Sequence, residues 1–552
     1  MKHNSNFNNI YIVFIFVSLL YVLMCSFFWN NYPMSESTNF WELVINSFED
    51  VVNNNWHPPF YIILLYIAKI IFKSYIGGYV VGIVSVIISI ILIYKIINRN
   101  NIIIKDIKVL WILLFSYISM PIIINGTFIF DIDNTILTPA ILFLYLSYLK
   151  YTFNNSIKNL IIFILSIVIS LWCKMSTPVF LIMSLIIYHL IIFDYNFLFK
   201  KLIPIVLISI GSFYITYGYL YTKYILNDYG SFELSSERTS LLISGANTFQ
   251  LPINQIVFSL GSNLIALILW TSPILILTIL YILIGTNENI RIIYKWQVNK
   301  FEKQYLIPII FIIITIISYT FILKLQASAG FPKYHYPIFA FLFIIIGIKL
   351  KTLTLRLNIF DLIFLGLTFF IYVYLIEDVL LKTYELGREK KVFEFVVFYL
   401  KTSIIYFVPI FLYFFIKKLI FKYTPNLIIS SLIFIIIINI SGFIYRAKVD
   451  YSTNYHYGIR GTSQALEFAN RIPMEKSVFL PFLGLFLKKQ PGIYNFANGR
   501  LKGTDRFIAN TDYLIITDHL LYTNNFFFGS KYVEKNYKRI DTIKSYGIWE
   551  KK

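Results

Sequence analysis

The sequence predicts an α-helical polytopic membrane protein that ends in a small α/β domain. Two observations predict the helical part: 58% of the 552 residues are hydrophobic and only 14% are charged. A soluble protein cannot bury that much apolar surface, whereas a bilayer accommodates it. A third observation predicts the small domain, because charged residues return and apolar runs shorten after residue 447. We therefore divide the chain into a transmembrane domain, residues 1–446, and an extracytoplasmic α/β domain, residues 447–552.

Apolar runs of roughly 17–25 residues recur along the first part and predict about thirteen transmembrane helices. The first run, residues 10–28, has no small-residue cleavage site after it, which indicates an uncleaved span and not a signal peptide. The expected spans cover residues 9–29, 76–97, 107–126, 134–150, 157–173, 176–194, 202–222, 257–284, 305–323, 335–349, 358–377, 402–416 and 427–445.

The apolar stretch at residues 58–72 is left out of these spans. As a helix it is about 22 Å long, which is short for a hydrocarbon core of about 30 Å. We expect it to lie at the membrane interface. Most lysine- and arginine-rich loops then fall on the cytoplasmic side, as the positive-inside rule requires, except the loop with Arg388, Lys390 and Lys391. The loops at residues 35–60, around Asp131 and around Lys333 then share the extracytoplasmic face with the C-terminus.

Residues 447–552 predict one helix and a small sheet. Thr462-Ser463 precedes an amphipathic stretch and marks a helix start. Short apolar runs predict strands at residues 477–480, 492–496 and 513–517, and a terminal hairpin at residues 539–543 and 547–550.

The net charge of +20 does not indicate nucleic-acid binding. The basic residues cluster beside hydrophobic segments, where they set orientation and contact anionic membrane lipids. Two cysteines, Cys25 and Cys173, predict neither a disulfide framework nor a metal site. The sequence has no glycine-rich phosphate loop and no GxSxG motif, so nothing indicates a nucleotide site.

The first candidate site is the acidic stretch at residues 35–60, which ends in His57-Pro58-Pro59. It contains four acidic residues and no Lys or Arg. A carboxylate here could take the proton from an attacking hydroxyl, and we single out Glu36 for that role. The alternative is a solvated loop carboxylate. The other three acids are interpreted as helix-face or capping charges: Glu42, Glu49 and Asp50.

A second candidate lies at the mouth of a membrane helix, where Asp131 and Asp133 alternate. Carboxylates near hydrocarbon are costly and are usually functional. The alternative is capping, in which Asp133 or Asn134 accepts an amide hydrogen from the helix that follows.

Basic residues follow in two later loops. Lys174 could hold a phosphate as a point charge or could extend to the interface as an anchor. Lys333 and His335 could bind an anionic headgroup or could belong to an aromatic and basic belt at the interface.

Four stretches, in this order, resemble the membrane-embedded C-type (GT-C) glycosyltransferases, in the branch of the protein O-mannosyltransferases and lipid A aminoarabinose transferases. The resemblance covers roughly residues 8–350. The family usually carries Asp-Glu at the head of the first loop, whereas this chain keeps one acid, Glu36. The stretches are Trp56-His57-Pro58-Pro59-Phe60-Tyr61, Asp131-Ile132-Asp133-Asn134, Lys174-Met175-Ser176-Thr177-Pro178 and Lys333-Tyr334-His335-Tyr336-Pro337.

The resemblance implies a transferase of hexose or pentose that takes the sugar from a polyprenyl-phosphate carrier. The acceptor would be a hydroxyl of a glycan, lipid or protein outside the cytoplasm. It implies that Glu36 acts as base or orients the acceptor, that Asp131 and Asp133 help to position acceptor, metal or donor, and that basic residues bind the phosphate. The implied substrate-binding residues are His57, Lys174, Lys333, Tyr334 and His335.

Cofactor and function class stay open in part. Glu36 and Asp131 could share a divalent ion, but two ligands from distant loops do not establish one, so no cofactor is predicted with certainty. A transporter or flippase of lipid-linked glycans would favour charges within spans and broken helices in matching halves. A glycan polymerase would favour a large basic outer loop, whereas the loop at residues 223–255 also carries three acids.

Overall fold

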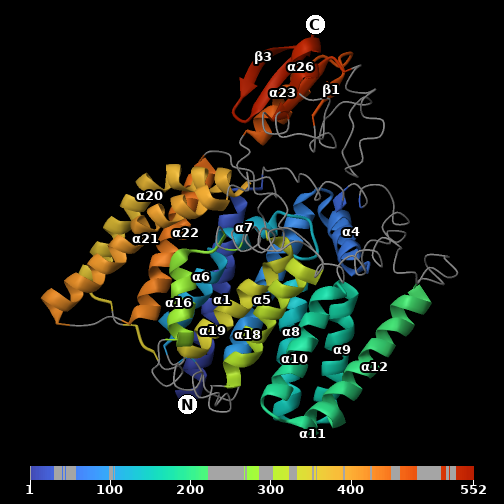
Figure 1. Cartoon of the computed structure of the whole chain (residues 1–552), viewed down its shortest axis with the longest axis vertical. Coiled ribbons are helices and arrows are strands. Elements are labelled where there is room, and N and C mark those ends of the chain that lie inside the picture. Colours follow the sequence, from blue (N-terminus) through green and yellow to red (C-terminus); the bar gives the residue numbers. More distant parts are fainter. Residues whose placement is uncertain are drawn as a thin grey trace.

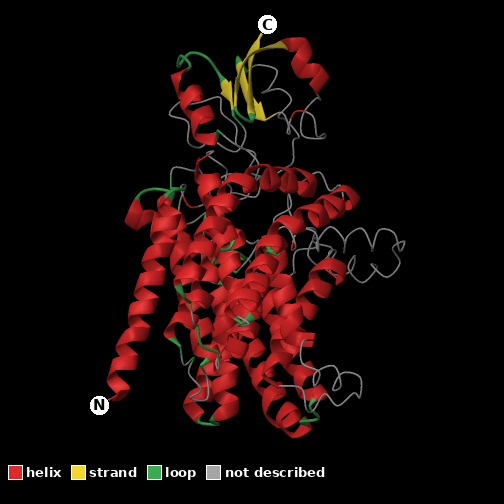
Figure 2. Cartoon of the chain, turned by 90° about the vertical axis from the view of Figure 1, so that its left-hand side faces the viewer, coloured by secondary structure: helices red, strands yellow, loops and turns green. Residues whose placement is uncertain are grey.

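The computed structural model of this chain is mostly helical, with a small sheet near the C-terminus (Figures 1 and 2). Most of the first acidic stretch, including Glu36 and His57, lies outside the residues that the structure describes, as do the loop at residues 223–255 and the strand expected at 492–496. The described residues are 2–29, 40–41, 44, 58–98, 104, 106–221, 267, 270–284, 303–322, 332–350, 353–355, 357–388, 392–422, 426–448, 461–480, 511–517, 521 and 530–552.

Most of the helices run side by side as a bundle (Figures 1 and 2). Short π-helical or 3-10 segments extend some of them: η2 Leu198–Leu202, η3 Tyr214–Tyr221, η6 Ser318–Ile322 and η7 Lys333–His335. The α-helices of this part are α1 Lys2–Ser26, α4 Phe60–Phe72, α5 Ile76–Ile97, α6 Ile107–Ile118, α7 Pro121–Thr127, α8 Leu137–Phe153, α9 Ile157–Cys173, α10 Ser176–Ile191, α11 Tyr195–Phe197, α12 Ile203–Phe213, α16 Pro273–Ile284, α18 Lys303–Ile317, α19 Tyr336–Leu350, α20 Ile359–Arg388, α21 Val392–Phe421 and α22 Leu427–Lys448.

Several of these helices can cross a membrane, which agrees with the predicted class of protein. Among the described residues, four are long and apolar enough by length and composition: Ile76–Ile97, Tyr195–Tyr221, Lys333–Leu350 and Leu427–Tyr445. The predicted number of about thirteen is not confirmed, because other apolar helices, such as Ile157–Cys173 and Ser176–Ile191, are shorter than 18 residues.

The span expected at residues 107–126 is two helices, α6 and α7, bent by 59° at a short break. Pro121 begins α7, since proline lacks the amide hydrogen that would continue α6 and fits the first turn of a new helix. The bend directs α7 towards the loop that carries Asp131.

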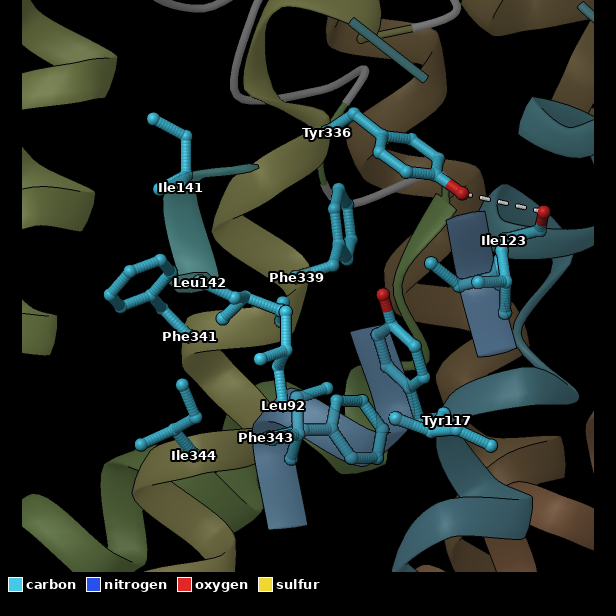
Figure 3. Close-up of a cluster of buried hydrophobic side chains, with 14 of the residues drawn as sticks. Leu92, Tyr117, Ile123, Ile141, Leu142, Tyr336, Phe339, Phe341, Phe343 and Ile344 are labelled. Atoms are coloured by element: carbon cyan, nitrogen blue, oxygen red, sulfur yellow. Dashed lines mark hydrogen bonds between the residues drawn. The ribbon is translucent and has the colours of Figure 1, made fainter. Parts of the chain in front are cut away.

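The helix α19 lies at the centre of the bundle. It packs against α5, α6, α8, α16, α18 and α22. Figure 3 shows Phe339 and Phe343 of α19 on the side of Tyr117 of α6, whereas Phe341 points the other way, towards Leu142 of α8. A helix that is apolar all round belongs in the interior, whereas α1 exposes one apolar face, as lipid contact requires. The residues just before α19 are therefore held by a rigid, buried element.

The helix α4 has 13 residues, which agrees with a segment too short to span a membrane. It ends at Lys73, whose backbone adopts the left-handed conformation with φ 52°. It buries Tyr61, Ile62 and Leu65 and exposes Ile67, Ile70 and Ile71. An exposed apolar face suits contact with lipid, and its position at the interface stays a prediction.

The small sheet has four strands in the order β1-β2-β4-β3. The strand β1 pairs parallel to β2, and β4 is antiparallel to both of its neighbours. These elements confirm the predicted helix start near residue 462, the strands at 477–480 and 513–517 and the terminal hairpin. Their bounds are α23 Thr462–Arg471, β1 Val478–Phe479, β2 Tyr513–Thr517, α26 Ser530–Asn536, β3 Tyr537–Ile543 and β4 Tyr546–Lys551.

Alternation along β2 gives the sheet two apolar faces. Ile515 faces Ala465 and Leu466 of α23, whereas Leu514 and Ile516 belong to the cluster on the other face. The sheet lies at the end of the molecule opposite the N-terminus (Figures 1 and 2). The boundary at residue 447 and the extracytoplasmic location stay predictions.

Candidate active site

The loop of residues 128–136 places two carboxylates side by side between α7 and α8. Figure 1 shows α7 at the end of the helical bundle that faces the sheet. Asp131 is 5% and Asp133 2% exposed. The loop holds its own shape: the amide of Asp133 donates to Asp131 Oδ1 at 3.0 Å, and the Thr135 hydroxyl donates to the Asp131 carbonyl at 2.6 Å.

Glycines of α5 let this loop pack directly against the helix. A Cβ atom at Gly82 would lie 2.5 Å from the carbonyl oxygen of Thr127, and one at Gly78 would overlap the ring of Phe130. The Phe130 ring also packs against Trp41 and Tyr79. The residue before Asp131 is therefore fixed by close packing on α5.

Lys174 reaches the loop from the junction of α9 and α10. It ends α9 in an extended conformation, and its Nζ donates to Asp133 Oδ1 at 2.5 Å and Oδ2 at 2.7 Å. The side chain is buried, and its ammonium also lies 4.8 Å from the ring centroid of Tyr334. A bidentate contact between buried groups fixes both side chains strongly.

Lys333 approaches Asp131 from the other side. Its Nζ lies 3.2 Å from Asp131 Oδ2 and 4.9 Å from the ring centroid of Tyr334. The Tyr334 ring thus contacts both ammonium groups. It also stacks on Tyr319 of η6, whose hydroxyl bonds to Thr177 Oγ1 at 2.6 Å. Two aspartates and two lysines therefore form one buried cluster around a pair of tyrosines.

Burial and charge act in opposite directions on the Asp133–Lys174 pair. Burial raises the pKa of Asp133 to about 6, although Lys174 opposes that shift. Burial lowers the pKa of Lys174, but the carboxylate of Asp133, together with Tyr319, Tyr334 and Asp131, outweighs it and raises that pKa. At neutral pH the pair is charged, and the Asp133 carboxylate is basic enough to accept a proton.

The described residues do not form a metal site. Among them, no three His, Cys, Asp or Glu side chains come together as ligands. Both carboxylates of the loop already face an ammonium group, with which a cation would have to compete. The ion that Glu36 and Asp131 could share is a prediction that falls partly outside the described residues. We derive no step through a metal.

The structure brings together six of the candidate residues: Asp131, Asp133, Lys174, Lys333, Tyr334 and His335. Glu36 and His57 lie outside the described residues. The functional roles of all eight stay predictions.

For four of these positions the alternative roles are helix capping and contact with the membrane interface. Ile136 is the cap residue of α8 and no side chain caps it, so neither Asp133 nor Asn134 does so. Lys174 and Lys333 are each 6% exposed and His335 is 1% exposed, whereas an interfacial anchor or belt residue reaches solvent.

Sequence reasoning missed Tyr319, which the structure places beneath both Tyr334 and Lys174. The signal was faint: Ser318, Tyr319 and Thr320 are consecutive polar residues inside an otherwise apolar run. A hydroxyl within a buried helix needs a hydrogen-bond partner, and here Ser176 and Thr177 supply it.

Two solved structures share this fold. ArnT from Cupriavidus metallidurans bound to undecaprenyl phosphate matches with a TM-score of 0.55 and 10% sequence identity, over 98% of this chain and 97% of that chain. The apo state of ArnT matches with a TM-score of 0.53 and 11% identity over the same shares. No protein-family model and no curated protein matches the sequence. The fold expected from the resemblance to C-type glycosyltransferases is confirmed.

Proposed function

We propose that this protein is a membrane-embedded glycosyltransferase that moves a sugar from a polyprenyl-phosphate carrier to a hydroxyl acceptor on the extracytoplasmic face. The observation that carries the proposal is the buried cluster of Asp131, Asp133, Lys174 and Lys333. Ionisable groups inside a membrane protein are expensive and usually serve function. The fold supports the choice of donor, because ArnT has the same fold and was solved bound to undecaprenyl phosphate.

The two lysines are suited to the phosphate of the carrier. When the bond between the sugar carbon and the phosphate oxygen breaks, negative charge grows on that oxygen. Ammonium groups that are already fixed in a buried site stabilise such charge without reorganisation. An ammonium has three donors, so Lys174 can contact both oxygens of Asp133 and still offer one to phosphate. Tyr334, between the lysines, keeps both in place.

The carboxylates are suited to the acceptor. A hydroxyl oxygen attacks the sugar carbon as the phosphate leaves, and its proton passes to a carboxylate. We assign that proton to Glu36, on the resemblance, and the orientation of the acceptor to Asp131 and Asp133. Attack from the side opposite the phosphate inverts the sugar carbon. The products are a glycosylated acceptor and the free polyprenyl phosphate.

We assign this chemistry to the transmembrane domain, residues 1–446, and to the extracytoplasmic face. The loop at 128–136 follows α7, which Figure 1 shows at the end of the bundle nearest the sheet. That placement supports one shared face for the cluster and for the α/β domain at residues 447–552. The domain could then contact the acceptor, which would be a glycan, a lipid or a protein.

Mass spectrometry of surface glycans and glycoproteins tests the proposal in cells that lack this protein. We expect one sugar to disappear and to return with the wild type but not with Glu36→Gln at equal membrane abundance. Restoration by both would remove Glu36 from the role of base. Loss of whole glycans, or accumulation of complete lipid-linked precursors, would instead favour a transporter or a polymerase.

A further inference from the structure

Three buried side chains on the segments that carry the charged cluster have neutral polar atoms that bond to no described residue. Asn134 follows Asp133 directly and is 1% exposed, yet neither its amide nitrogen nor its amide oxygen is bonded within the part of the chain that the structure describes. The same holds for the Thr138 hydroxyl, 2% exposed, and for His335 Nε2, 1% exposed. Buried polar atoms are nearly always satisfied, so each of these needs an explanation.

These three residues belong to the two segments that carry the carboxylates and Lys333. Asn134 belongs to the loop of the carboxylates, and Thr138 follows four residues later in the first turn of α8. His335 precedes α19, which packs against α8. Its ring meets Tyr319 edge-on at 5.6 Å, and Tyr319 in turn faces the Lys174 ammonium at 5.5 Å. The three residues therefore lie on the same segments as the groups assigned to phosphate and acceptor, or one ring away from them.

We propose that Asn134, with Thr138 and His335, binds the hydroxyl groups of the carried sugar. The inference rests on the proposed function and names the part of the site that recognises the sugar. An amide offers a donor and an acceptor at once, and a hydroxyl and a neutral imidazole can serve as either. This set matches neighbouring hydroxyl groups, which also donate and accept, and it lacks the charge that phosphate favours.

The position of the group also favours the carried sugar. In the donor, the sugar is bonded directly to the phosphate. When the ammonium groups hold that phosphate, the sugar must therefore lie immediately beside them. Asn134 adjoins Asp133, which binds Lys174 through both oxygens. A phosphate on the lysines thus brings the sugar to the segment that holds Asn134. A site built to hydrogen-bond a substrate hydroxyl strongly rejects an analogue that lacks that hydroxyl, because the buried polar groups of the site are then left unbonded. Residues of this kind therefore determine substrate specificity.

The test is the thermal unfolding of the full-length protein in lipid nanodiscs. The probes are undecaprenyl phosphate alone and undecaprenyl phosphate that carries glucose, mannose or a 4-amino-pentose. We expect the wild type to gain Tm with the bare carrier and to gain more with at least one sugar-bearing carrier. In Asn134→Leu the gain with the bare carrier should persist and the extra gain should vanish, with a roughly 10- to 100-fold weaker affinity for that donor.

Asn439→Leu is the matched control, because Asn439 is 5% exposed and its amide donates to Ser119 at 3.4 Å. It should lower the Tm without ligand and keep the sugar-dependent gain. Asn134→Leu should not lower the Tm without ligand, because it removes polar atoms that have no partner. If Asn134→Leu does not fold, Thr138→Val, which replaces one hydroxyl by a methyl group, should reduce the sugar-dependent gain.

The outcomes separate this inference from the function on which it rests. If Asn134→Leu lowers the Tm as Asn439→Leu does and keeps the sugar-dependent gain, the amide binds structural water and the inference is overturned. The same conclusion follows if the wild type responds equally to the bare carrier and to every sugar-bearing carrier. If no carrier changes the Tm of the wild type, the proposed function fails as well.

Discussion

Two places in the helical part bury an aspartate against a lysine, and their surroundings differ. In the candidate site, Asp133 and Lys174 come from a loop and from a helix junction. In the second place, Asp361 near the start of α20 meets Lys417 of α21 at 2.7 Å, and the two side chains are 0% and 3% exposed. The Asp361 carboxylate also accepts hydrogen bonds from the Tyr413 hydroxyl at 2.9 Å and from the backbone amide of Asn358 at 2.7 Å.

The difference indicates what each pair is for. Asp361 and Asn358 exchange side-chain to backbone hydrogen bonds at the first turn of α20, which is the arrangement of a capping box. The pair joins two helices. Both oxygens of Asp361 are used, as are those of Asp131 and Asp133, so the difference lies in the neutral polar neighbours. The pairs of Asp131 and Asp133 lie instead beside polar atoms of Asn134 and His335 that have no partner in the described structure. A complete network fits a structural role, whereas an incomplete one fits a site that awaits a ligand.

The largest expected effect comes from replacing each pair by apolar residues of similar size. A buried ion pair can be replaced in this way with little change in stability, often within about 2 kcal/mol. Asp361→Leu with Lys417→Met should therefore leave transfer nearly unchanged. Asp133→Leu with Lys174→Met should lower the turnover rate by about 1000-fold or more, because charge at the reacting groups is lost. Turnover and Tm in nanodiscs measure both effects.

Equal loss of turnover in the two double variants, at equal Tm, would contradict the comparison. It would mean that Asp361 and Lys417 also act on the reaction. Full turnover in both double variants would mean that neither pair does.

A second variant tests whether the site depends on how its loop is held. In Gly82→Ala the new Cβ would press on the Thr127 carbonyl and shift the segment that leads to Asp131. Overpacking of this kind costs about 1–3 kcal/mol. A displacement of about 1 Å at reacting groups can reduce the rate by up to about 100-fold. Single-turnover kinetics at a temperature well below the Tm would measure the rate.

Gly211→Ala in α12 is the matched control, because nothing lies within 4 Å of the Cβ atom it would add. Alanine favours a helix over glycine by up to about 1 kcal/mol, so this variant should be slightly more stable and fully active. Full activity of Gly82→Ala would show that the loop adjusts without cost.

The sequence predicted the local features well, because they depend on short-range physics. Long apolar runs predicted the helices, and two short runs separated by a turn-like stretch predicted the hairpin at β3 and β4. The acids near Asp131 and the bases at Lys174 and Lys333 were also identified one by one, since charge beside apolar runs is conspicuous. Pro121 was present in the span expected at 107–126, but hydropathy alone did not predict the break of 59°.

The pairing of these residues could not be predicted, because it depends on which helices pack together. Asp131 and Lys333 are 202 positions apart, and Asp133 and Lys174 are 41 apart. The packing of α8 against α9 brings Lys174 to Asp133, and the packing of α19 against α5 and α8 brings Lys333 to Asp131. The sequence also could not decide whether Asp133 or Asn134 caps the following helix, and in the structure the Asn134 amide neither caps α8 nor bonds to another described residue.

The pH dependence of transfer should show a smaller effect, which we assign to Asp133 of the Asp133–Lys174 pair. Burial raises the pKa of Asp133 to about 6, so at pH 5 most of this carboxyl is protonated and Lys174 loses its charged partner. We expect kcat/KM to fall about tenfold for each pH unit below 6. A carboxyl whose pKa is higher in the folded than in the unfolded protein contributes stability at pH values below its unfolded-state pKa. That contribution is lost as the pH rises through the folded-state pKa of about 6. The fall in activity at pH 5 therefore occurs without loss of stability from this group, which Tm measurements at pH 5 and 7 would verify.

The smallest effect distinguishes a lysine that binds phosphate from one that joins two helices. In Lys333→Gln the side chain can still donate to Asp131, but the positive charge near Tyr334 is gone. A lost charge-assisted contact should raise the KM for the lipid donor about fivefold, with kcat changed less, because binding of the phosphate suffers before the chemical step. Lys417→Gln should lower the Tm and leave that KM unchanged, since its partner Asp361 keeps Tyr413 and the Asn358 amide. An unchanged KM in Lys333→Gln would mean that Lys333 only stabilises the loop of Asp131. Only the Asp133–Lys174 pair would then differ in role from the Asp361–Lys417 pair.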